Sequence, residues 1–108
     1  MSELVSMLSN GEHPLEVSLR PETTPAALQN CIAKGYVHLK FTGTRGGTSL
    51  YVPLDSALCD LESADFESRQ GSIKLVGTLV LDYIPVRCHA TVSLATMAGS
   101  GHLEVLPA

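Results

Sequence analysis

The strongest constraint on the fold is a two-residue alternation of apolar and polar side chains that recurs along the chain. The alternation is clearest in "VRCHATVSL", residues 86–94, and it also occurs in residues 14–20, 36–41 and 50–54. Successive side chains of a β-strand point to opposite faces of the sheet, so each segment predicts a strand with one buried and one exposed face. The chain is therefore expected to be built mainly of half-buried strands.

Short connections that contain turn residues separate these segments and favour antiparallel pairing. Residues 43–47 contain three glycines, and residues 82–85 form a tight connection before "VRCHATVSL". Gly99-Ser100-Gly101 is expected to turn the chain into a last strand, "HLEVL". Such connections are too short for the crossover that parallel strands need, so the last three strands are predicted to form an antiparallel meander.

One segment has the signals of a helix instead. Thr24 is a typical N-cap, Pro25 suits the first helical position, and Gly35 suits the left-handed cap beyond the end. Residues 3–8 are expected to add a short N-terminal helical turn. The apolar stripe of the main helix consists of Leu28, Cys31 and Ile32.

Together these elements predict a β-rich α+β fold in a single compact domain, residues 1–108. About six mainly antiparallel strands would form a twisted sheet or a partial barrel, with one helix at about residues 24–34. A chain of 108 residues is long enough for one hydrophobic core but not for two.

The composition argues against several classes of protein. The net charge is −4 and the 7 Lys and Arg residues are spread singly, whereas a nucleic-acid-binding protein carries a basic stripe. No apolar run approaches the length that spans a bilayer, and the N-terminal residues lack the pattern of a secretory signal. The 3 cysteines are odd in number and show no CxxC spacing. We expect a cytoplasmic protein with reduced thiols that binds neither nucleic acid nor a membrane.

The glycine-rich stretch "KFTGTRGGTSLYV", residues 40–52, has two interpretations. Glycines allow the positive φ angles that hairpin turns need, and this loop lies between two predicted strands. Alternatively, Arg45, Gly46 and Gly47 could hold an anionic group with backbone amides and a guanidinium. A phosphate cradle usually has a helix N-terminus behind it, and here the glycines lead into a strand. We interpret residues 43–47 as a hairpin turn and keep these three residues as candidate contacts for a partner or ligand.

Histidines supply the other candidate site. His38, His89 and His102 fall on the polar phase of their strands, and they would share one outer face if those strands were neighbours. Cys88 and His89 are adjacent, so in a strand they point to opposite faces and cannot bind one metal ion together. The sequence has no typical metal-ligand spacing and no cofactor motif. We therefore predict no metal site and no cofactor, and interpret the histidines as exposed residues of polar sheet faces.

Acidic residues gather in the connection that follows residue 54. They have neither the spacing nor the central Gly of a calcium-binding loop. We interpret this segment as a solvated connection, and a docking surface for a basic partner is the alternative. The residues are Asp55, Asp60, Glu62, Asp65 and Glu67.

The leading functional hypothesis is a non-catalytic binding or accessory module that acts through a sheet face or edge and the loop at residues 43–47. The sequence contains no catalytic motif, which argues against an enzyme. The partner would be a protein or a small ligand. The alternative is a small enzyme or ligand-binding barrel that uses a polar sheet face, with the site residues Tyr36, His38, Lys40 and His89.

A homodimer is also predicted. Val76 and Val80 fall on the nominally outer face of "SIKLVGTLVLD", and exposed apolar strands tend to pair with one another. Alternatively, the helix at residues 24–34 covers these valines.

The cysteines are expected to differ in reactivity. Cys88 lies on the inward phase of its strand and Cys31 on the helix stripe, so both should react slowly with a thiol reagent. Cys59 stands beside Asp60 and is expected to react fastest of the three.

Overall fold

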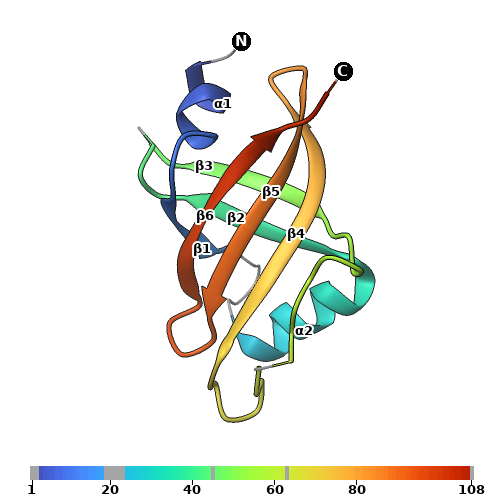
Figure 1. Ribbon diagram of the computed structural model, residues 1–108. Coiled ribbons are helices and arrows are strands. Elements are labelled where there is room, and N and C mark those ends of the chain that lie inside the picture. The colour runs from blue at the N-terminus through green and yellow to red at the C-terminus, as the bar shows by residue number, and fades with distance from the viewer. Residues whose placement is uncertain (1–2, 19–23, 45, 63, 108) are drawn as a thin grey trace.

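The computed structural model describes residues 3–18, 24–44, 46–62 and 64–107. Within these ranges, one antiparallel sheet of six strands is accompanied by two short helices (Figure 1). The elements are α1 (Glu3–Leu8), β1 (His13–Val17), α2 (Pro25–Lys34), β2 (Tyr36–Phe41), β3 (Thr48–Pro53), β4 (Ser72–Leu81), β5 (Ile84–Ser93) and β6 (Ala98–Val105). The predicted β-rich α+β fold is confirmed. Neither helix in the described part of the chain is long and apolar enough to cross a membrane.

The sheet is nearly closed into a barrel. Its strand order is β3-β2-β1-β6-β5-β4, so β3 and β4 are the two edges, and an isolated bridge between Leu54 and Gly77 brings these edges together. A side chain at Gly77 would collide with the Pro53 carbonyl oxygen, because the two backbones approach so closely there. Only glycine fits this crossing without a backbone shift.

Apolar side chains, most of them aliphatic, fill the space that the sheet encloses. The alternate residues predicted to point inward on β2 and β5 are buried, as the two-residue pattern requires. Figure 1 shows α1 beside one end of the barrel and α2 at the other, and each contributes a fully buried leucine, Leu8 and Leu28. The largest fully buried side chains of the strands are Phe41, Leu15, Leu39, Ile73, Leu75 and Leu103.

The ends of α2 are those that the sequence predicts. The Thr24 Oγ1 atom accepts a hydrogen bond from the Ala27 N–H at 3.1 Å. Gly35 takes the left-handed conformation with a φ of 90°, and its N–H donates to the Ile32 carbonyl oxygen. Within the predicted stripe, Leu28 is buried, whereas Cys31 and Ile32 are half-buried.

The predicted turn at Gly99-Ser100-Gly101 is wrong. These residues belong to β6, and the chain turns at residues 94–97 instead, where Met97 has a φ of 56°. A side chain at Gly99 would collide with the Thr91 carbonyl oxygen, and one at Gly101 with that of His89. The two glycines therefore serve a close approach of β6 to β5 rather than a change of chain direction.

Val76, which the sequence places on the nominally outer face of its strand, is covered, because the segment after β3 runs along the edge of β4. The Asp55 N–H donates to the Val76 carbonyl oxygen at 2.8 Å, and the Cys59 thiol lies within hydrogen-bonding distance of the Val76 N–H and carbonyl oxygen. Val76 is consequently only 2 % exposed, while Val80, beyond the reach of this segment, is 67 % exposed. This connection therefore lies against Val76.

Candidate binding face on strands β5 and β6

Two neighbouring cross-strand pairs bring polar side chains together on the outer face of β5 and β6. In the antiparallel register, His89 stands opposite His102 and Arg87 stands opposite Glu104. The alternate residues Val86 and Cys88 of β5 point into the core, so Arg87 and His89 point away from it. Register and alternation together place four polar side chains side by side.

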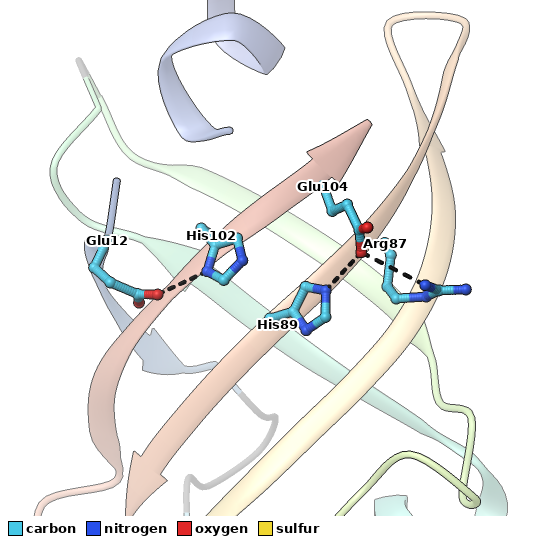
Figure 2. A network of polar contacts seen from close by, with 5 residues as sticks. All are labelled: Glu12, Arg87, His89, His102 and Glu104. Carbon is cyan, nitrogen blue, oxygen red and sulfur yellow. Dashed lines mark hydrogen bonds and ion pairs between the residues drawn. The ribbon is translucent and has the colours of Figure 1, made fainter. Parts of the chain in front are cut away.

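Hydrogen bonds fix the two imidazole rings of this face. The rings of His89 and His102 are stacked, with centroids 4.8 Å apart and an angle of 11° between their planes. Figure 2 shows that each ring has its own carboxylate: His89 Nε2 lies 2.9 Å from Glu104 Oε1, and His102 Nδ1 lies 2.7 Å from Glu12 Oε1. Glu12 comes from the connection between α1 and β1, so three segments build the face.

The carboxylates determine which ring nitrogen carries the proton in a neutral imidazole. An ionised carboxylate only accepts hydrogen bonds, so His89 Nε2 and His102 Nδ1 are the N–H donors. The remaining nitrogens, Nδ1 of His89 and Nε2 of His102, then each keep a lone pair as acceptors. The neutral pair can therefore present two acceptors to a partner.

Glu104 connects the two cross-strand pairs. It receives the hydrogen bond from His89, and Arg87 Nη1 lies 3.5 Å from the same carboxylate oxygen. The hydrogen bond from His89, helped by the nearby Arg87 charge, lowers the pKa of Glu104 below its ordinary value. The Arg87 Nε atom is buried and makes no hydrogen bond within the described ranges.

The face forms a shallow, open hollow rather than an enclosed pocket. Its walls include the two histidines, Glu104, Val105 and Ser9 of the α1–β1 connection. The side chains of His89 and His102 are 27 % and 35 % exposed, so a partner can reach both rings. Among the described residues, no group of three or more His, Cys, Asp or Glu side chains is arranged to hold a metal ion. The chemistry on offer is polar recognition by hydrogen-bond donors and acceptors.

His38 belongs to a different part of the surface. It packs against Tyr36 and Tyr51 on β2 and β3, with ring centroids 5.7 Å and 5.3 Å away. Two strands, β1 and β6, separate β2 from β5 in the sheet. His38 and His89 therefore do not contribute to one site, although both lie on outer faces.

The glycine-rich loop joins the paired strands β2 and β3. Gly46 and Gly47 have φ angles of 76° and 78°, and the Gly47 N–H donates to the Thr44 carbonyl oxygen at 3.0 Å. Lys40 lies so close to Gly47 that a side chain there would meet its methylene chain. Arg45 lies outside the described residues, so its candidate role stays a prediction.

The acidic connection has a local structural use. The Oδ1 atoms of Asp55, Asp60 and Asp65 each accept a hydrogen bond from the backbone N–H two residues later, at 3.2, 3.0 and 3.1 Å. Aspartates commonly stabilise turns in this way. Hydrogen bonds from Ser68, from its side chain first, lower the pKa of Asp65. These three carboxylates thus stabilise successive turns, and a docking role for the segment stays a prediction.

Sequence reasoning missed Glu12, Arg87 and Glu104 as members of the site. The signal was present, because Arg87 and His89, like His102 and Glu104, are two residues apart and share one face of a strand. What was lacking was the register of β5 against β6, which decides that these pairs meet.

The chain matches no protein-family model, and no curated protein matches it in sequence. The candidate face is therefore defined by its geometry alone.

Proposed function

We propose that the protein is a small, non-catalytic binding module that recognises its partner with the outer face of β5 and β6. The observation that carries this proposal is the His89–His102 stack, because each ring is held by its own carboxylate at an open hollow. Side chains oriented in advance lose less conformational entropy on binding. The proposed contacts are His89, His102, Glu104 and Arg87.

The filled interior supports a binding module over a small enzyme or ligand-carrying barrel. Phe41, Leu39 and Leu103 are at most 1 % exposed and occupy the space where a barrel would carry a ligand. The alternative site of Tyr36, His38, Lys40 and His89 would need these side chains to converge, and β2 and β5 are not neighbours. A protein partner suits an open, polar face better than a small molecule, which usually occupies a concave pocket.

We also propose a cytoplasmic location. Cys31, Cys59 and Cys88 are all free thiols, and a reducing compartment would keep them so. The acidic net charge of −4 supports a partner other than nucleic acid.

A comparison of three immobilised proteins tests the proposed face. His89→Ala/His102→Ala removes both rings, and His38→Ala is the matched control, because it removes an exposed histidine from the outer face of β2. Each protein captures partners from an extract of the cells that produce it, and mass spectrometry identifies them. Partners held by the wild type and the control should be lost from the double variant, whose unchanged circular dichroism shows that it is folded.

Capture of the same partners by the double variant would rule out the β5–β6 face as the recognition surface. Loss of the same partners from a fourth immobilised protein, Arg45→Ala, would instead assign recognition to the loop at residues 43–47. That loop is the second contact of the leading hypothesis, and the sequence predicts that Arg45→Ala leaves thermal stability nearly unchanged, because a lone charge in a turn would contribute little to folding.

A further inference from the structure

A two-residue turn joins β4 to β5 and projects at one end of the molecule (Figure 1). Leu81 pairs with Ile84, and the two turn residues, Asp82 and Tyr83, have φ angles of 50° and 65°. Hairpin turns with two positive φ angles strongly favour glycine at the second position. Tyr83 occupies that position, and a bulky side chain rarely adopts this conformation.

The fold gives no reason for an aromatic residue at this position. The Tyr83 side chain is 99 % exposed, and the nearby Val80 is 67 % exposed, so the ring buries nothing within the molecule. Backbone strain at a residue that the core does not use points to a functional role for that residue. Tyrosine is one of the residues most enriched at protein interfaces.

The same chain carries a recess that suits such a ring. It lies between the C-terminal end of α2 and the connection after β3, and its cavity volume is about 290 Å³. Sites for whole small-molecule ligands span roughly 300–1,000 Å³, so this recess lies at the lower limit of that range and has room for a single large side chain. It is lined in part by Ile32, Leu54 and Leu61, which supply apolar walls, and by Lys34, Ser56 and Cys59.

The positions of the turn and the recess exclude a contact within one molecule. The turn lies at one end of the barrel and α2 at the other (Figure 1). We propose that Tyr83 of one copy inserts into the α2 recess of a second copy. The charges agree with this pairing, because Asp82 precedes the tyrosine and Lys34 lines the recess. The contact joins two different surfaces of the protein. Two copies form a closed dimer if each can insert its Tyr83 into the recess of the other, and they form a short open chain if only one of the two contacts can be made.

Sedimentation equilibrium over a range of concentrations tests the role of the ring. The wild type should exceed its monomer mass of 11.5 kDa as concentration rises, and Tyr83→Ser should weaken association at least tenfold. Tyr51→Ser is the matched control, because it removes another exposed tyrosine, 54 % accessible, from the outer face of β3. A monomeric wild type at the highest concentration, or equal loss with both variants, would overturn the proposal.

Oxidative cross-linking then tests the recess. An Asp82→Cys/Cys59→Ser protein, which keeps Tyr83 and carries a thiol beside it at the turn but none in the recess, is mixed with wild type, and the disulfide-linked peptides are mapped. The introduced thiol should bond to Cys59 of the wild-type copy, which lines the recess, in preference to Cys31, which does not. Preferential bonding to Cys31, or between two introduced thiols, would assign the contact to another surface and overturn the proposal.

Discussion

Replacing Tyr83 with glycine is expected to stabilise the monomer. A left-handed backbone conformation costs a residue other than glycine about 1–2 kcal/mol, and Tyr83 has a φ of 65°. Removing the ring loses little apolar burial, because the side chain is 99 % exposed. The greater freedom of glycine in the unfolded chain offsets about 0.4–1 kcal/mol of the gain. The free energy of unfolding should therefore rise by about 0.5–1 kcal/mol, and Tm by roughly 2–8 °C.

Thermal unfolding followed by circular dichroism at low protein concentration, where copies do not associate, measures this effect. Tyr83→Ala is the control, because it removes the ring but keeps a side chain in the left-handed conformation. Its Tm should stay close to that of the wild type. A lower Tm for both variants would mean that the tyrosine ring stabilises the fold through packing, and the reasoning from strain and exposure would be refuted.

Three further substitutions or modifications test other parts of the structure. Gly101→Ala should lower the free energy of unfolding in urea by about 2–3 kcal/mol, because its side chain would collide with the His89 carbonyl oxygen and press on Leu15; an unchanged midpoint would disprove the close crossing of β5 and β6. Burial raises the pKa of Cys88 to about 12, so a thiol reagent at neutral pH should label it last in the native protein; early labelling would contradict the burial. Glu104→Gln removes a carboxylate whose pKa is lower in the folded protein than in the unfolded chain. The ionised carboxylate therefore stabilises the fold at a pH above its ordinary pKa, and this stabilisation is lost as the pH falls through the lowered pKa. The Tm difference from wild type should therefore be present above the ordinary pKa of about 4.5 and shrink as the pH falls progressively below it. A difference that does not change with pH would contradict the assigned contact.

The sequence patterns that succeeded are local ones. Thr24, Pro25 and Gly35 define α2 because caps depend on residues within one turn of the helix. The inward phase of β5 was predictable, since the alternation repeats within a single strand and Cys88 shares it. Each of these features needs information from only a few neighbouring positions.

The candidate face depended on a relation between strands that no single segment contains. The chain turns at residues 94–97, and this position sets the register that places His89 opposite His102. Interpreting Gly99-Ser100-Gly101 as the turn shifts that register by several residues and separates the two histidines. Glu12 is still harder to predict, because its hydrogen bond to His102 joins positions 90 residues apart.

Glycine and valine show why identical residues need different explanations. Gly46 and Gly47 supply positive φ angles, whereas Gly77 and Gly101 make room for a neighbouring backbone, and composition does not separate the two uses. Val76 and Val80 likewise share one face of β4, yet only the first is covered, because the connection after β3 reaches no further along the edge.

Tyr83 extends this reasoning from folding to function. In the sequence, Asp82-Tyr83 is an unexceptional pair within a tight connection, and nothing about it suggests strain. Only the combination of a positive φ and a fully exposed ring reveals a residue that the fold does not require. Since glycine would serve this turn at lower cost, the tyrosine is evidence for a contact that a single copy does not contain. Stability measurements on Tyr83→Gly and association measurements on Tyr83→Ser therefore address one question, and they should move in opposite directions.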